Sequence, residues 1–98
     1  MSSSEHIGYC SFTKAIEHLG DRWNLLILRE LAMLGPRGFN ELVTGLPGRI
    51  SRSVLSERLR RLENLGLVAH AGGTPYRLTA AGSDLIPTIA SLRGWAAT

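Results

Sequence analysis

The sequence predicts a mainly α-helical domain of 98 residues with one small β-hairpin. Apolar residues recur at helical spacing through most of the chain, and glycine and proline residues interrupt them at short intervals. Two short runs flank the turn sequence Gly72–Pro75, as the strands of a hairpin do. We therefore expect five helices and one hairpin in a single domain that spans residues 1–98.

The first two predicted helices, 11–19 and 22–34, are separated by Gly20 and Asp21. Glycine suits the C-terminal cap of the first helix. The Asp21 carboxylate can accept hydrogen bonds from the exposed amides that begin the second helix. Apolar residues occupy most of the circumference of 22–34, so we expect this helix to be central and buried.

The next two predicted helices, 39–46 and 52–65, are joined by a tight turn at Pro47-Gly48. Ser51 is a favourable N-cap for the longer of the two. A leucine recurs on one face of that helix at three- and four-residue steps, which predicts a buried stripe formed by Leu55, Leu59, Leu62 and Leu65.

The hairpin is predicted to pair strand 68–71 with strand 76–78. A last helix follows from Thr79. Pro87 has no backbone N–H, so we expect a kink or a late start of the helix there.

Basic residues gather between residues 37 and 61, where six arginines face two acids. This stretch carries a charge of +4 (6 − 2), whereas the whole chain carries +3. A localised basic segment on a nearly neutral background is typical of a nucleic-acid-binding protein. The arginines are Arg37, Arg49, Arg52, Arg58, Arg60 and Arg61, and the acids are Glu41 and Glu57.

A short helix, a turn, a longer helix and then a two-stranded wing form an architecture that binds the DNA major groove. The second helix of the pair, 52–65, enters the groove, which is wide enough for one helix. With its leucine stripe facing inward, its outer face combines small hydroxyl residues with arginines that can reach guanine edges or phosphates. We therefore predict that double-stranded DNA is bound by Arg49, Ser51, Arg52, Ser53, Ser56 and Arg60, together with Arg77 of the wing.

Two neighbouring residues of this helix receive a different interpretation. Arg58 lies beside the leucine stripe and is predicted to be structural. Glu57 lies on the outer face, where it either accepts a hydrogen bond from a cytosine amine or pairs with Arg60 or Arg61.

At this point the sequence resembles the HxlR family of MarR-like winged helix-turn-helix regulators of bacteria. The resemblance covers about residues 9–95 and depends on the order and spacing of several segments. These are GDRWNLLILREL at 20–31, FNEL at 39–42, ISRSVLSERL at 50–59, LGLV at 65–68 and LTAAG at 78–82. A cysteine ahead of the first helix, here Cys10, is also common in the family.

The resemblance implies a homodimer that binds a palindromic operator and dimerises through its first and last helices. The expected seam consists of Phe12, Ile16 and Leu19 from the first helix and Leu85, Ile89 and Leu92 from the last. Alternatively, the apolar stripe of the last helix is part of the hydrophobic core of a single chain. Many relatives sense oxidants or electrophiles, some of them through the N-terminal cysteine, which makes Cys10 a candidate redox sensor.

Several positions depart from the family pattern. Ser11 follows Cys10 where relatives usually have proline, and by comparison with the family pattern Arg49 looks like an additional residue in the turn before the fourth helix. The wing is shorter than usual and its tip carries no charge. The chain stops shortly after Trp95, where relatives often continue the last helix.

Other functions receive little support from the sequence. The three histidines and the single cysteine have no metal-binding spacing, and neither paired carboxylates nor a glycine-rich phosphate loop is present. We therefore expect no metal, no cofactor and no enzymatic activity, and a cytoplasmic protein without membrane association. Cys10 is alternatively a small buried apolar residue. Open alternatives for the whole chain are a winged-helix protein-interaction module and the DNA-binding half of a larger regulator, and a small-molecule effector stays unidentified.

Overall fold

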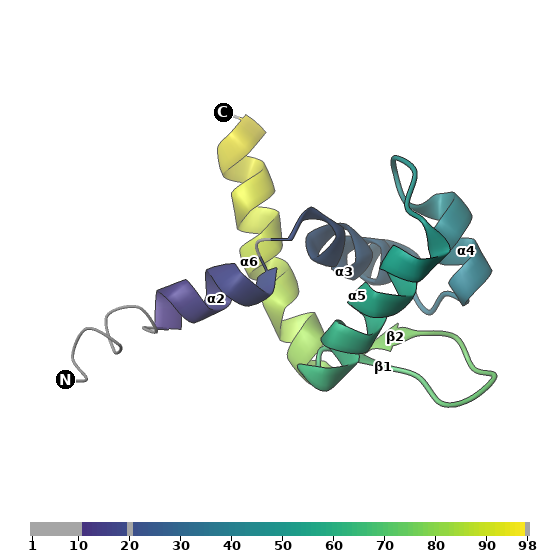
Figure 1. The fold of residues 1–98 in the computed structure, drawn as a ribbon. Coiled ribbons are helices and arrows are strands. Elements are labelled where there is room, and N and C mark those ends of the chain that lie inside the picture. The colour runs from purple at the N-terminus through teal and green to yellow at the C-terminus, as the bar shows by residue number, and fades with distance from the viewer. Residues whose placement is uncertain (1–10, 20, 98) are drawn as a thin grey trace.

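The computed structural model describes residues 11–19 and 21–97. Within them the chain is mainly helical with one antiparallel two-stranded hairpin, which confirms the predicted fold class (Figure 1). The elements are α2 (Ser11–Leu19), α3 (Arg22–Leu34), α4 (Phe39–Gly45), α5 (Arg52–Asn64), β1 (Val68–Ala69), β2 (Arg77–Leu78) and α6 (Ala80–Ala97).

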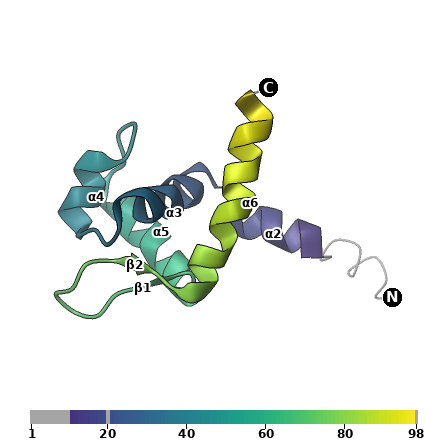
Figure 2. The same cartoon turned by 180° about the vertical axis from the view of Figure 1, so that it is seen from behind.

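Helix α3 is the centre of the fold, as its apolar circumference predicts. It contacts α2, α4, α5, α6 and β2, and the side chains of Ile27 and Leu28 are completely buried (Figures 1 and 2). Leucines of α4 and α5 complete the core around it, because each of these amphipathic helices turns its apolar face toward α3. The buried apolar residues are Ile27, Leu28, Leu31, Leu42, Leu46, Ile50, Leu55, Leu59, Leu62, Leu67 and Val68.

The starts of α3 and α5 lie where their predicted caps place them. Asp21 Oδ1 accepts a hydrogen bond from the Trp23 amide at 2.8 Å, and Ser51 Oγ accepts one from the Val54 amide at 3.1 Å. Gly48, in the turn before α5, has a φ of 86°, a conformation that glycine adopts without steric cost. Helices α4 and α5 each end one residue earlier than predicted, since Leu46 and Leu65 are C-caps.

The hairpin is shorter than predicted. Val68 pairs with Leu78 and Ala69 with Arg77, whereas the sequence predicted strands 68–71 and 76–78. Tyr76 instead pairs with Arg37 in an isolated bridge, with its carbonyl accepting from the Arg37 amide at 2.9 Å and its amide donating to the Arg37 carbonyl at 2.7 Å. The wing is thereby attached to the segment that leads into α4.

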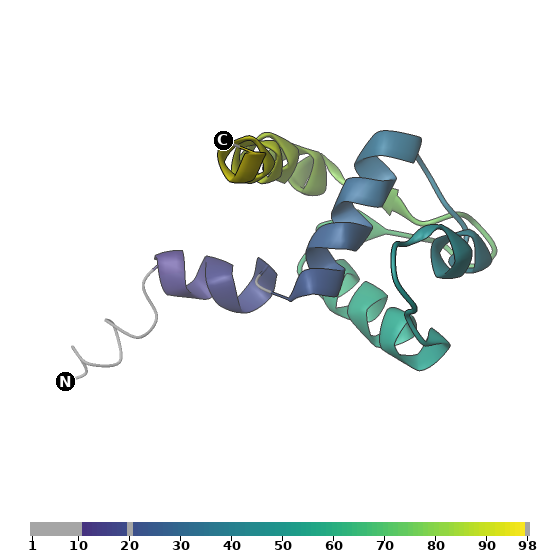
Figure 3. The same ribbon diagram turned by 90° about the horizontal axis from the view of Figure 1, so that it is seen from above.

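Helix α6 runs without interruption through Pro87, so the predicted late start is wrong. Its first turn is capped by Thr79, whose hydroxyl accepts a hydrogen bond from the Gly82 amide at 3.0 Å. Toward its C-terminus the helix leaves the core, and Leu92 and Trp95 are 57% and 78% exposed. Figure 3 shows that α2 also extends away from the rest of the molecule. None of the described helices is long and apolar enough to cross a membrane.

Candidate nucleic-acid interface

The face of α5 that is opposite the core carries the residues predicted to meet DNA. Leu55, Leu59 and Leu62 are at most 1% exposed and hold the helix against the core. The turn and the outer face are exposed at all six predicted positions, which are Arg49, Ser51, Arg52, Ser53, Ser56 and Arg60. The structure therefore places these residues together on the surface of one turn and one helix.

Both acids of the basic segment are paired with arginines. Glu41 Oε2 lies 3.3 Å from Arg37 Nη1, and Glu57 pairs with Arg58. Four arginines of the same segment make no ion pair with any acid in the described part of the chain; these are Arg49, Arg52, Arg60 and Arg61. The turn and the exposed side of α5 thus keep an uncompensated positive charge.

Arg58 connects α5 to the start of α3. Its Nε and Nη2 atoms each lie 3.0 Å from Asp21 Oδ2, across 37 residues of sequence. Burial raises the pKa of the Asp21 carboxyl, but hydrogen bonds from Arg58 and from the Trp23 amide outweigh it, so this pKa lies below its ordinary value. The pKa of Arg58 is raised by its hydrogen bonds to Asp21 and Glu57. The structure agrees with the structural interpretation of Arg58.

One of the two alternatives predicted for Glu57, an ion pair with Arg60 or Arg61, is wrong. Its carboxylate binds Arg58, the adjacent residue, and not Arg60 or Arg61. Arg58 turns inward toward Asp21, and Glu57 therefore lies against its guanidinium.

Two of the predicted contact residues also have local structural partners. The Ser51 hydroxyl caps α5 and lies 3.3 Å from the Ser53 hydroxyl. The guanidinium carbon of Arg52 lies 5.7 Å from the centre of the Phe39 ring, within the range of a cation–π contact. Arg52 therefore connects the first turn of α5 to α4.

Arg22 is a further basic residue at this surface, and the sequence did not predict its place there. Its guanidinium stacks beside the Trp23 ring, 4.9 Å from the centroid. Its Nη2 atom lies 3.1 Å from the point where a Cβ on Gly48 would stand, so it borders the turn that carries Arg49. No sequence signal marks this proximity, because 26 residues separate Arg22 from Gly48.

The wing has one exposed basic side chain among its described strands, Arg77 on β2. The rings of His70 and Tyr76 stack with centroids 4.0 Å apart and planes 8° apart, which connects the two sides of the hairpin. His70 Nδ1 also lies 3.7 Å from Glu63 at the end of α5. Burial and, secondarily, the charge of Glu63 raise the pKa of the Tyr76 hydroxyl.

The predicted dimer seam is divided by the structure. Leu85 and Ile89 pack partly against the core, and Leu19 and Leu85 line the same shallow depression within one chain. Leu92 is exposed. The side chains of Phe12 and Ile16 lie outside the described part of the structure, and so does Cys10.

The described residues contain no group of three or more histidine, cysteine or acidic side chains arranged to hold a metal ion.

These features define the class of the protein as a winged helix-turn-helix, in which α4 and α5 form the helix-turn-helix and β1 and β2 the wing. A model of the family described as HxlR-like helix-turn-helix matches residues 18–98. The chain belongs to this family. The predicted resemblance is therefore confirmed.

An HTH-type transcriptional regulator of Mycobacterium tuberculosis is 45% identical over 91 residues, which cover 87% of this chain and 56% of the relative. The chain thus spans little more than half the length of this relative. Because the family and the curated relatives are transcriptional regulators, they agree with the expectation that the protein is not an enzyme.

Two solved structures show the same fold at useful sequence identity. Quinone-bound YodB from B. subtilis superposes with a TM-score of 0.78 at 36% identity, covering 87% of this chain and 93% of YodB. A transcriptional regulator of the MarR family from Enterococcus faecalis gives a TM-score of 0.77 at 32% identity, covering 88% of this chain and 82% of the regulator.

Proposed function

We propose that the protein is a transcriptional regulator that binds double-stranded DNA sequence-specifically, as a homodimer, through a single winged-helix domain. The observation that carries the proposal is the exposed face of α5 and its preceding turn, where arginines have no acidic partner among the described residues. Short hydroxyl side chains between them allow close approach to base edges, and the guanidinium groups can contact guanine or phosphate. Arg22 and Arg77 are two further exposed arginines, and we propose that they contact the DNA backbone.

Arg60→Ala and Arg52→Ala are each expected to weaken operator binding by about 1–3 kcal/mol if the side chain reads a base. Affinity of the unmodified protein should fall steeply with salt, with a log–log slope of about −0.9 per neutralised phosphate. Mobility-shift titrations at several salt concentrations measure both effects, using the upstream DNA of the gene as the first candidate operator.

Lys14→Ala is the matched control, because Lys14 is an exposed cation on α2, remote from the turn and α5 in sequence. Unchanged affinity for both arginine variants would contradict this placement of the DNA. Binding that does not depend on salt would favour a protein-interaction module instead.

A two-fold symmetric dimer is expected, because a pair of modules reads two half-sites separated by about one helical turn of DNA or a multiple of it. The seam would be formed by α2 and α6. Both helices extend from the domain (Figures 1 and 3), and Leu92 and Trp95 on α6 are exposed. Sedimentation velocity at micromolar concentration measures the oligomeric state directly, and Leu92→Glu should shift the protein from dimer toward monomer. A wild-type chain that sediments as a monomer would contradict the proposal.

We further propose that Cys10 makes the regulator responsive to electrophiles or oxidants. The likeness to YodB, which has been crystallised with a quinone bound, supports this function. Because the chain has one cysteine, the available products are a bridge between two subunits, a mixed disulfide with a small thiol, or an alkylated thiol. Treatment with a quinone or a mild oxidant should reduce operator affinity of the wild type and leave Cys10→Ser unchanged. An equal response of both proteins would show that the signal enters elsewhere.

A further inference from the structure

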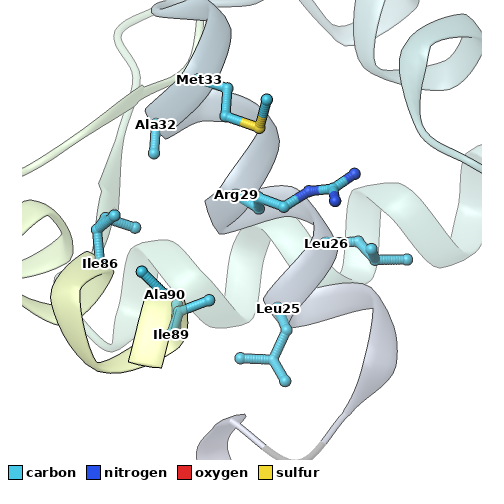
Figure 4. A pocket seen from close by; sticks show the side chains of 8 residues that line it. All are labelled: Leu25, Leu26, Arg29, Ala32, Met33, Ile86, Ile89 and Ala90. Atoms are coloured by element: carbon cyan, nitrogen blue, oxygen red, sulfur yellow. The ribbon is translucent and has the colours of Figure 1, made fainter. Parts of the chain in front are cut away.

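The structure has an apolar groove between α3 and α6 (Figure 4), and none of the residues that line it belongs to α5. Leu25, Leu26 and Met33 contribute one side, and Ile86, Ile89 and Ala90 the other. Its volume is about 310 Å³, at the lower end of the range for sites that hold one small molecule. An aromatic or short aliphatic body would bury its surface against these side chains.

Arg29 is the one charged side chain among the described residues that line the groove. It extends from α3 between Leu26 and Met33, and its guanidinium lies on the side away from Ile86 and Ile89 (Figure 4). The Nε atom is buried and makes no hydrogen bond to any described residue. Nor does any described acid form an ion pair with this guanidinium.

A buried donor without a partner is costly, and a carboxylate can satisfy an arginine with two parallel hydrogen bonds. The groove therefore combines an apolar channel with a guanidinium at one edge that has no acidic partner among the described residues. We infer that it binds a small amphiphilic anion, with the apolar body between α3 and α6 and the carboxylate on Arg29.

The role of such a ligand as an effector rests on the proposed DNA-binding function. Helix α3 forms one wall of the groove, and its N-cap Asp21 binds Arg58 on α5. A ligand that shifts α3 relative to α6 can therefore act on α5 through a direct contact. Such a ligand changes operator affinity only if it binds one arrangement of α3 and α6 more tightly than another.

The direct test uses the full chain and 1-naphthoate as the probe, with the neutral 1-naphthamide as its comparator, in calorimetric titrations at pH 7. We expect 1-naphthoate to bind with one molecule per chain and more tightly than 1-naphthamide. Arg29→Met should weaken the binding of 1-naphthoate by about tenfold to a hundredfold, the range for a lost charge-assisted hydrogen bond. The affinity for 1-naphthamide should stay unchanged. Arg61→Gln, which removes an exposed arginine outside the groove, should change neither affinity.

Ala90→Leu provides a second variant that retains the charge. Because Ala90 is an exposed residue on the wall of the groove, a larger side chain fills the site without entering the core, and both probes should lose binding. Equal effects of Arg29→Met and Arg61→Gln on 1-naphthoate would overturn the proposal.

The groove could instead be covered by a second copy of the chain, since Ile89 also belongs to the predicted seam. In that case the wild type would bind neither probe, and Ala90→Leu would shift its sedimentation from dimer to monomer. That result would overturn the proposal. The titrations contain no DNA, so a failure of the DNA-binding function would leave their outcome unchanged.

Discussion

Gly82→Ala is expected to destabilise the protein by about 3 kcal/mol, the upper end of the usual range for overpacking. A Cβ at this position would lie well under 3.0 Å from the Leu67 carbonyl oxygen and 3.1 Å from its carbonyl carbon. These are backbone atoms, so no side-chain rotation relieves the contact. The change therefore requires the first turn of α6 to separate from the segment that begins the wing.

The Leu67 carbonyl cannot move freely, because it accepts a hydrogen bond from the Thr79 amide at 3.0 Å. The Thr79 hydroxyl in turn donates to the Gly66 carbonyl at 2.6 Å and accepts from the Gly82 amide at 3.0 Å. Separation of α6 from Leu67 would break this group of hydrogen bonds. The close approach thus connects the end of α5, the wing and the last helix.

Gly94→Ala is the matched control in the same helix. A Cβ at Gly94 meets no described atom within 4 Å, and alanine is favoured over glycine in a helix. We expect this variant to be more stable than the wild type by about 0.5–1 kcal/mol. Urea denaturation measures the unfolding free energy of both variants. If Gly82→Ala is as stable as Gly94→Ala, the backbone at Leu67 moves enough to accommodate the added methyl group.

Local signals in the sequence located most of the helices. Asp21 and Ser51 begin α3 and α5 as predicted, since an N-cap acts on amides two or three residues away. The leucine stripe of α5 is buried as predicted because a helical repeat alone determines which residues share a face. The exposed candidate residues on α5 follow from the same geometry.

The features that the sequence did not reveal depend on contacts between distant segments. Tyr76 leaves the predicted strand to pair with Arg37, 39 residues earlier, and Arg22 approaches Gly48 through the packing of α3 on the turn. Periodicity and capping contain no information about either approach. The partner of Glu57 was misjudged for the same reason, because it depends on the inward turn of Arg58 toward Asp21.

Asp21 performs two functions with its two carboxylate oxygens, and substitutions can separate them. Oδ1 caps α3 through the Trp23 amide, whereas Oδ2 binds Arg58 on α5. Asparagine keeps the cap but removes the charge. Asp21→Asn should therefore lower the free energy of unfolding by about 1 kcal/mol, a modest value because the ion pair with Arg58 is partly exposed to solvent. Asp21→Ala loses the cap as well and should cost about 2 kcal/mol.

Glu41→Gln serves as the control for an ion pair at the surface. Its partner Arg37 is four residues away on the same exposed side, and glutamine keeps an acceptor for the Gly38 amide. Exposed pairs of this kind contribute about 0.3–0.5 kcal/mol. If Asp21→Asn costs no more than Glu41→Gln, the contact between α3 and α5 does not stabilise the fold beyond an ordinary surface pair.

The pH dependence of unfolding gives a second, independent measurement of the Asp21–Arg58 pair. The pKa of Asp21 in the folded state lies below its ordinary value of 3.8, so the folded protein binds a proton here less readily than the unfolded chain. The stabilisation is therefore complete above about pH 5 and is lost as the pH falls below 4 and through the folded-state pKa. Urea titrations at pH 7, 5 and 3 give the difference in unfolding free energy between wild type and Asp21→Asn. This difference should be the same at pH 7 and pH 5 and smaller at pH 3. A difference that is the same at all three pH values would mean that Arg58 does not stabilise the Asp21 carboxylate in the folded protein.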